Sequence, residues 1–208
     1  IMEKPSLPSG TRDFSPQVML RRKYITATME RVFLSHGFGA LETPSIENLK
    51  TLQGKYGNEG DQLLFKVLNS GDFLSKAESS LLQAKDSKGI TPQISDRGLR
   101  YDLTVPLARY VVMNRNEIVF PFKRYQMQPV WRADRPQKGR YREFWQCDID
   151  VVGANSVVSE AELIEMYQEV FSALDLGVKI RINHRGILDA FMGVLGSKEH
   201  WDAFMVII

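Results

Sequence analysis

Cysteine is the rarest residue in this sequence. Cys147 is the only cysteine among 208 residues, so no internal disulfide can form. Because secreted proteins often depend on disulfides, a lone cysteine favours a cytoplasmic protein. No apolar run approaches the roughly 20 residues that a membrane helix needs, so we expect no membrane association. The three histidines lack metal-ligand spacing, and neither a GxxxxGK[ST] loop nor a GxGxxG turn is present. We therefore expect no metal held by the protein alone and no glycine-rich phosphate loop.

A large excess of one charge is also missing. Lysine and arginine number 27 and aspartate and glutamate 25, which leaves a formal net charge of +2. So small a surplus does not make the whole surface attractive to nucleic acid, so any site for a polyanion has to be a local patch. With 43% hydrophobic residues, the chain is an ordinary globular sequence, long enough for one large domain or a domain and part of another.

In the first half of the chain, apolar spacing predicts a helix from about Pro16 to His36, which Gly37 ends. The apolar face of this helix should carry Val18, Ile25, Met29, Val32 and Phe33. Strands should follow at residues 38–44 and 61–69, the second apolar on both faces and therefore buried. Residues from 72 onward should begin as helix and continue as a polar loop over 86–98.

The pattern of the second half of the chain predicts a hairpin and several helices. Its expected elements are a strand at 99–104, a helix from Pro106, hairpin strands at 122–134 and 142–153, a helix from Ser159, a strand at 178–183 and a helix at 186–196. Pro106 suits a first helical position, and Ser159 with Glu162 forms a capping-box pattern. Strands joined largely as hairpins, with helices between some of them, predict an α+β fold with a mostly antiparallel sheet flanked by helices.

The hairpin strands carry polar side chains where a core is expected. Because side chains alternate across a strand, one face of 142–153 should carry Phe144, Gln146, Asp148 and Asp150. The partner strand should add Gln126, Gln128, Val130, Arg132 and Asp134, and the strand at 99–104 should add Arg100, Asp102 and Thr104. Cys147 falls on the opposite, apolar face, and we expect it in the core. Such a polar face is either a binding site or simply a solvated sheet surface.

The loop of this hairpin concentrates positive charge. Its cations are Arg132, Arg135, Lys138, Arg140 and Arg142. Arginine matches phosphate oxygens with two parallel hydrogen bonds, and lysine adds a point charge, so the loop could hold a triphosphate. Phe144 could then offer its ring to a purine, and the acids farther along the strand could hold an amine. The alternative is a basic surface hairpin that binds nucleic acid non-specifically or binds nothing.

These residues point to a family. The stretch WRADRPQKGRYREFWQ resembles motif 2 of class II aminoacyl-tRNA synthetases, in the version found in histidyl-tRNA synthetases. The stretches LRYDLTVPLARYV and QCDIDVVG look like the segments that build the histidine pocket of that family, and GTRDF, ETPSIE and INHRGIL also fit. Pro44 stands where the motif 1 proline would be, which implies a homodimer formed through this region. The resemblance extends from about Pro8 to about Asp189.

The resemblance implies activation of histidine with ATP and Mg²⁺, followed by transfer to tRNA(His), in a class II catalytic core. The ATP-binding residues would be Arg132, at the α-phosphate and the reacting carboxylate, Asp134, near the adenine side, Arg140, at the γ-phosphate, and Phe144, on the adenine. The histidine-binding residues would be Asp102, Thr104 and Gln146 at the α-amino group, Arg132 at the carboxylate, and Asp150 at the imidazole. Arg132 would be the catalytic residue, because it stabilises charge that develops in the transition state.

The sequence also departs from the family pattern. The RGLDYY-type segment, motif 3 and the anticodon-binding domain are not found in residues 1–208, which we therefore interpret as a partial class II catalytic domain with little activity alone. The apolar, uncapped residues 199–208 agree with a chain that continues. The alternative is a synthetase paralogue that serves as the regulatory subunit of ATP phosphoribosyltransferase. The intact Arg132 and cationic loop argue against it. A pocketless nucleic-acid-binding domain is the third possibility; its affinity would fall steeply with salt.

Overall fold

The computed structural model describes residues 4–53 and 63–195. The chain divides into two compact units, residues 1–170 and 171–208. The first unit holds the sheets and all of the predicted site residues. The predicted C-terminal segment 199–208 and the first two positions of the predicted strand 61–69 lie outside the described residues.

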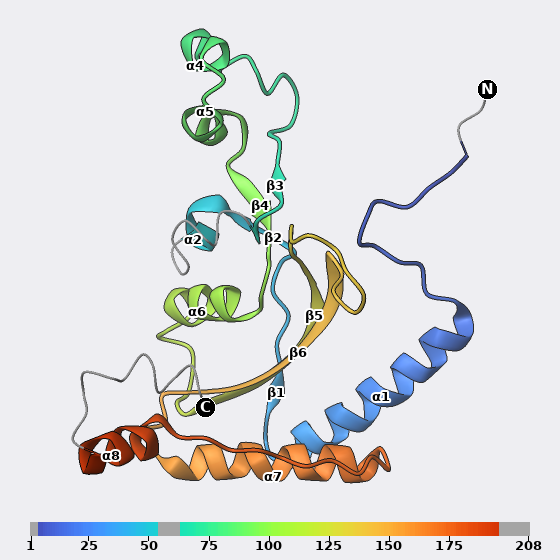
Figure 1. Ribbon diagram of the computed structural model, residues 1–208, viewed down its shortest axis with the longest axis vertical. Coiled ribbons are helices and arrows are strands. Elements are labelled where there is room, and N and C mark those ends of the chain that lie inside the picture. Colours follow the sequence, from blue (N-terminus) through green and yellow to red (C-terminus); the bar gives the residue numbers. More distant parts are fainter. Residues whose placement is uncertain (1–3, 54–62, 196–208) are drawn as a thin grey trace. The chain divides into compact units, whose positions relative to one another are not determined.

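A three-stranded sheet with the order β1-β5-β6 is the larger of the two sheets described in the first unit. The strands β5 (Phe122–Trp131) and β6 (Glu143–Val152) are the antiparallel hairpin that the sequence predicts, and Figure 1 shows them as a long curved pair. The short strand β1 (Gly39–Ala40) runs parallel to β5. It is shorter than the predicted strand 38–44, because only two of its residues pair with β5.

A second small sheet has the order β2-β4-β3 and is antiparallel throughout. Its strands are β2 (Ile46–Asn48), β3 (Lys66–Val67) and β4 (Arg97–Leu99). An apolar cluster of Leu49, Leu52, Leu64, Tyr101 and Val105 contains residues that flank these strands. Three of the four strand pairings are antiparallel and helices flank both sheets, so the predicted α+β class is confirmed.

The helix α1 (Pro16–Ser35) matches its prediction closely. The Ser15 hydroxyl caps it by accepting a hydrogen bond from the Val18 N–H, and Gly37 at φ +76° provides the left-handed residue at its end. Its predicted apolar face is only partly correct. Val32 and Phe33 are buried, but Val18 and Ile25 remain exposed, because the N-terminal half of the helix has no core to cover among the described residues.

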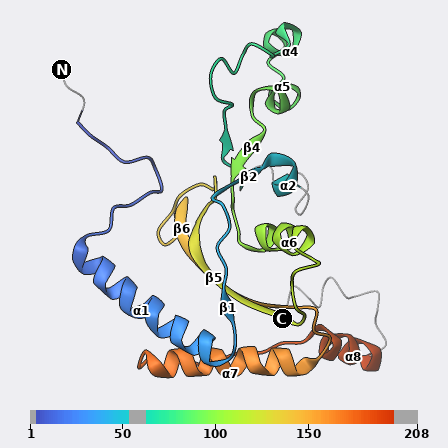
Figure 2. The same ribbon diagram turned by 180° about the vertical axis from the view of Figure 1, so that it is seen from behind.

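Six further helices are described, and none of the helices in residues 4–53 and 63–195 is long and apolar enough to cross a bilayer. They are α2 (Leu49–Gln53), α4 (Ser79–Gln83), α5 (Ser87–Ile94), α6 (Thr104–Met113), α7 (Val157–Ala173) and α8 (Arg185–Leu195). In both views, α4 and α5 lie at the far end of the β2-β4-β3 sheet from the β5–β6 hairpin (Figures 1 and 2). The helix predicted at 186–196 is confirmed by α8.

Three predicted elements differ from the structure in the region before α6. The strand predicted at 99–104 is wrong, because only Leu99 belongs to a strand, β4, and Thr104 already begins α6. Among the described residues of the predicted strand 61–69, only Lys66–Val67 form a strand, because only these two residues pair with β4, and Leu68 is exposed rather than buried. The prediction of a polar loop at 86–98 is wrong, because this stretch contains α5 and then β4. The Asp86 carboxylate caps α5 by accepting hydrogen bonds from the N–H groups of Lys88 and Gly89. A single N-cap therefore outweighs the turn-forming composition of this stretch.

Three more corrections concern the C-terminal part and α6. The helix α7 begins at Val157, two residues before the predicted capping box, because the Ser156 hydroxyl accepts from the Val158 N–H. Residues 178–183 form no strand, since nothing in the described chain pairs with them. Pro106 is the third residue of α6 rather than its first, since the helix begins at Thr104.

Candidate active site

The inner face of the β5–β6 hairpin is the polar surface that strand alternation predicts. Cross-strand pairs place Val130 opposite Phe144, Gln128 opposite Gln146, Gln126 opposite Asp148 and Arg124 opposite Asp150. Three of these side chains, those of Arg124, Gln126 and Val130, are fully buried. A solvated sheet surface would be exposed, so that alternative does not describe this face.

The segment between β4 and α6 runs along the end of β5 and brings Asp102 to this surface. The Trp131 N–H donates to the Arg100 carbonyl at 3.0 Å, which fixes the two segments side by side. Asp102 is 5% exposed, and its Oδ1 accepts from the Val105 N–H at 3.2 Å. Asp102 is thus a helix cap as well as a candidate ligand. Thr104 is the exposed first residue of α6.

Arg132 lies just beyond β5, where the two groups of predicted ligands meet. Its Nε donates to the Tyr101 carbonyl at 3.0 Å, which is the only side-chain hydrogen bond of Arg132 among the described residues. Its guanidinium carbon is 5.1 Å from the centroid of the Phe144 ring. Because this hydrogen bond uses only Nε, both terminal amino groups of the guanidinium can donate hydrogen bonds to an anionic ligand. The structure therefore brings the predicted catalytic arginine, the predicted adenine platform and the Asp102 segment together.

The hairpin loop holds Asp134 and Arg140 against each other. Arg140 donates to Asp134 Oδ2 from Nη2 at 2.8 Å and from Nε at 3.2 Å. Arg142 donates from Nε to the Asp134 carbonyl at 3.0 Å, and Gly139 at φ +81° turns the loop. The remaining loop cations, Arg135 and Lys138, are exposed. The predicted γ-phosphate ligand therefore has an acidic partner of its own in the loop.

The acids on the sheet face share one buried cation. Arg124 Nη2 lies 2.6 Å from Asp150 Oδ2. Burial raises the pKa of the Asp148 carboxyl, Arg124 opposes that rise, and the charges of Asp150 and Asp102 add to it. Burial likewise lowers the pKa of Arg124, against the effect of the surrounding acids. The four charges therefore form one coupled group, in which a single arginine offsets three carboxylates.

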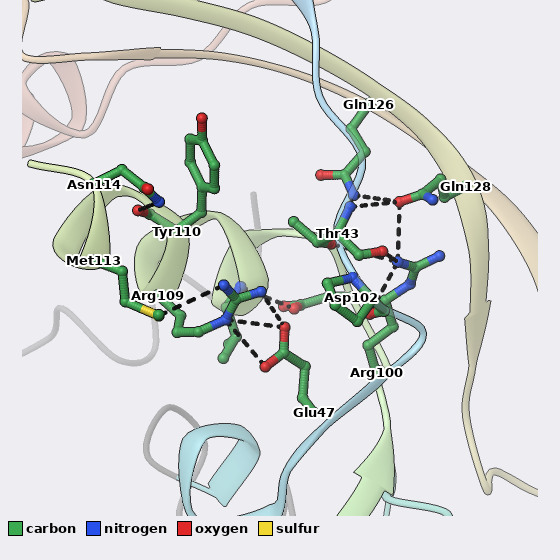
Figure 3. A network of polar contacts seen from close by, with 12 residues as sticks. Thr43, Glu47, Arg100, Asp102, Arg109, Tyr110, Met113, Asn114, Gln126 and Gln128 are labelled. Carbon is green, nitrogen blue, oxygen red and sulfur yellow. Dashed lines mark hydrogen bonds and ion pairs between the residues drawn. The ribbon is translucent and has the colours of Figure 1, made fainter. Parts of the chain in front are cut away.

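Sequence reasoning assigned no role to two buried arginines in this region, Arg124 and Arg100, although it placed Arg100 on the polar face. Alternation places Arg124 on the same face as Gln126 and Gln128, so its position in the strand was a usable signal. Arg100 is fully buried and donates to the Thr43 carbonyl and to Gln128 Oε1 (Figure 3). It also donates to the carbonyls of Pro44 and Pro129. Arg100 thereby ties the segment before β2 to β5. No pattern among neighbouring residues predicts these contacts, because the hydrogen-bond partners of Arg100 lie 28 to 57 residues away in the chain.

The N-terminal arm also contributes to the hairpin. The Gly10 carbonyl accepts from the Arg142 N–H at 2.8 Å, and the Arg12 guanidinium carbon lies 3.3 Å from the centroid of the Tyr141 ring. Gly10 has φ +84°, and a Cβ there would lie 2.8 Å from Arg142 Cγ. Glycine is therefore required on both conformational and steric grounds.

The prediction that Cys147 belongs to the core is wrong. Cys147 is exposed, and so is its neighbour Trp145, at 48%. Among the described residues, the outer face of β6 is covered only in part, with the Arg22 guanidinium 5.0 Å from the Trp145 ring. Alternation assigned the correct face, but it could not say how much of the chain covers that face.

A cavity of about 780 Å³ lies away from this surface, beside α2, β3 and α5. Its lining includes Lys50, Lys66, Lys88 and Asp96 but none of the predicted site residues. The candidate site is therefore the β5–β6 surface with its loop and not this cavity.

Comparison with known proteins places the chain in context. A family model described as histidyl-tRNA synthetase matches residues 74–206. A curated protein of Christiangramia forsetii named histidine–tRNA ligase is 58% identical over 205 residues, which is 98% of this chain and 45% of that protein. The chain thus spans less than half the length of this relative.

Solved structures agree on the fold. A histidyl-tRNA synthetase from Nostoc sp. PCC 7120 is 34% identical, with a TM-score of 0.74, and the match covers 97% of this chain and 42% of that one. A Bacillus halodurans protein titled ATP phosphoribosyltransferase regulatory subunit/histidyl-tRNA synthetase is 24% identical, with a TM-score of 0.65, over 84% of this chain and 40% of that one. This second similarity concerns the fold alone.

Proposed function

Because this chain belongs to the histidyl-tRNA synthetase family, we propose that it forms part of the catalytic domain of a cytoplasmic enzyme that activates histidine with ATP and transfers it to tRNA(His). One observation carries the proposal. Arg132 lies 5.1 Å from the Phe144 ring and is bonded to the Tyr101 carbonyl, next to Asp102 in the chain and at the end of a buried polar sheet face. Such a position lets one guanidinium contact a nucleotide and an amino acid at once.

The nucleotide would lie along the loop side of Arg132. Phe144 would stack on the adenine, Asp134 would orient the nucleotide near the adenine side, and Arg132 would bind the α-phosphate. Arg140 would bind the γ-phosphate. Arg140 is paired with Asp134, so binding of ATP would exchange one anionic partner of this arginine for another.

The histidine would lie over the sheet face. Asp102, Thr104 and Gln146 would hold its α-amino group, because an ammonium donates to carboxylate, hydroxyl and amide oxygens. Asp150, which is part-buried and opposite Arg124, would accept from the imidazole N–H. Arg132 would hold the carboxylate on the side of the phosphates.

The reaction follows from this placement. A carboxylate oxygen of histidine attacks the α-phosphorus in line, an O–P bond forms, and the bond to the bridging oxygen of pyrophosphate breaks. Arg132 stabilises the negative charge that develops at the α-phosphate, and positioning supplies much of the remaining acceleration. The described residues include no group of three or more His, Cys, Asp or Glu side chains placed to hold a metal. Mg²⁺ would be bound largely by the ATP phosphates, whose charge it offsets.

The domain organisation and assembly are part of the proposal. Residues 1–208 would be a partial class II catalytic domain with motifs 1 and 2, and a homodimer would form through α1 and the Pro44 region. The exposed apolar side chains Leu20, Tyr24 and Leu34 on α1 support such an interface. A concentration-independent monomer in sedimentation would refute the dimer.

The regulatory-subunit alternative receives less support. The highly similar curated relative is named a ligase, and Arg132 with its loop is intact. The test is histidine-dependent ATP–pyrophosphate exchange by the longest protein that the gene encodes, with the other amino acids as controls. Exchange with histidine alone is the expected result. Histidine binding without exchange would favour the regulatory subunit, and salt-sensitive binding of nucleic acid without any histidine response would favour the third possibility.

Asp102→Asn separates ligand binding from helix capping in the same assay. Asparagine can still accept the Val105 N–H, so α6 should remain capped. The loss of negative charge should raise the KM for histidine far more than the KM for ATP. Equal losses for both substrates would instead make Asp102 a structural residue.

A further inference from the structure

Arg124 is a charged side chain with no exposure to solvent, and nothing in the proposed reaction so far uses it. It is the third residue of β5, on the face that would hold histidine, directly opposite Asp150. Burying a guanidinium is costly unless it is paired and its donors are bonded. The residue therefore needs either a structural reason or a functional one.

The contacts of Arg124 point toward the site. Its Nη2 forms an ion pair with Asp150 Oδ2 at 2.6 Å, which lacks hydrogen-bond geometry, and donates a hydrogen bond to the Leu103 carbonyl at 3.4 Å. Its Nε and Nη1 are buried and have no hydrogen-bond partner among the described residues. A purely structural arginine is expected to have its donors satisfied, as Arg100 largely does. The strongest contact of Arg124 is instead to the carboxylate proposed to face the imidazole.

Charge gives this pairing a second consequence. Asp148 and Asp150 follow each other on the same face of β6, and without a nearby cation they would favour a positively charged amino-acid side chain. Because Arg124 pairs with Asp150, its positive charge offsets one of the negative charges at this end of the surface. A neutral imidazole then finds a fixed acceptor oxygen, whereas the cationic side chains of lysine and arginine meet a guanidinium.

Resting on the proposed function, we propose that Arg124 is a positioning and specificity residue, which holds the Asp150 carboxylate through Oδ2 so that Oδ1 accepts the imidazole N–H of histidine. It acts through Asp150 and does not touch the reacting atoms. The competing explanation is that Arg124 only ties β5 to the Leu103 carbonyl and so stabilises the fold.

The test uses the longest protein that the gene encodes and the pyrophosphate exchange assay. Arg124→Gln should raise the KM for histidine on the order of tenfold, a size typical of groups coupled in one ion-pair network, and leave the KM for ATP within about twofold. It should also increase inhibition by lysine and arginine. Lys123→Gln is the matched control, because Lys123 is the neighbouring residue of the same strand and pairs with Glu162, at 2.6 Å, on the other face. The control should leave both KM values unchanged.

A double-mutant cycle distinguishes positioning from stability. If Arg124 acts through Asp150, then Arg124→Gln combined with Asp150→Asn should raise the histidine KM no more than the larger single change. Additive effects, or an unchanged histidine KM in a folded Arg124→Gln protein, would overturn the proposal. If Arg124→Gln does not fold, Arg124→Lys keeps the charge without the planar fork. It should still raise the histidine KM, and a wild-type KM in that variant would equally overturn the proposal.

Failure of the two proposals gives different results. Absence of histidine-dependent exchange in the wild-type protein would refute the proposed function and the role of Arg124 with it. Normal exchange in the wild-type protein, with variants at Arg124 that keep the wild-type histidine KM and discrimination, would refute only the assignment of Arg124.

Discussion

Replacing Arg109 by methionine should destabilise this chain more than almost any change of a surface charge. Arg109 on α6 holds Glu47 of β2 with Nη2 at 2.6 Å from Oε1 and Nε at 3.1 Å from both carboxylate oxygens (Figure 3). The Glu47 side chain is only 6% exposed, while that of Arg109 is 24% exposed. Arg109→Met removes the cation and leaves the buried carboxylate behind.

The structure sets the expected size of the loss. Removing one partner of a buried ion pair costs about 3–5 kcal/mol. Two features lower this value here: water reaches part of the Arg109 side chain, and the positive charge of Arg100 lies close enough to Glu47 to interact with it. We therefore expect a loss of about 2–3 kcal/mol in the free energy of unfolding, or roughly 4–12 °C in Tm for a chain of this size.

Urea unfolding followed by circular dichroism measures this loss, with thermal melting as a second probe. Asp96→Asn is the control, because it breaks the Asp96–Arg97 pair, whose side chains are about 60% exposed, and should change stability by less than about 1 kcal/mol. The double variant Arg109→Met with Glu47→Leu should recover part of the loss, since it leaves no charge buried. A loss below about 0.5 kcal/mol in Arg109→Met would refute the claim that this pair braces α6 against β2.

Three further results are expected. Arg132→Ala should reduce pyrophosphate exchange by at least about a hundredfold with an unchanged circular dichroism spectrum, and normal exchange would remove Arg132 from the catalytic role. Gly10→Ala should cost about 1–3 kcal/mol and raise the KM for ATP, because its Cβ would displace Arg142 at the base of the loop; a wild-type melt would contradict this. Burial, with a 2.6 Å hydrogen bond to Glu30, raises the pKa of Tyr125 to about 12. Its stabilising contribution is therefore complete below pH 10 and lost as pH rises toward 12, so Tyr125→Phe should flatten the alkaline decline in unfolding free energy, and an equally steep decline would refute this.

The hairpin and the long helices were predictable because their signals are local. Ten residues of alternation on each side of the loop predict β5 and β6, and apolar spacing that ends at Gly37 predicts α1. Local signals failed where elements are short or lack a partner. Asp86 made a helix where composition favoured a loop, and the apolar alternation at 178–183 met no strand to pair with.

The same distinction between local and long-range signals applies to the candidate site. Arg132, Asp134, Arg140 and Phe144 belong to one continuous stretch, so their resemblance to a known motif identified them together. The ion pair between Asp134 and Arg140 could be identified only from the folded loop. Exposure of Cys147 was beyond the sequence too, because it depends on what covers the far face of β6.

The sequence by itself determined which residues share a face of each strand, and with the motif resemblance it indicated which chemistry they could perform. Only the tertiary structure decided that Arg124 meets Asp150 and that the Asp102 segment lies against the end of β5. The physical reason is the range of the interactions. Side-chain alternation follows from covalent geometry within a few residues, whereas strand register and the burial of a charge depend on packing between segments far apart in the chain.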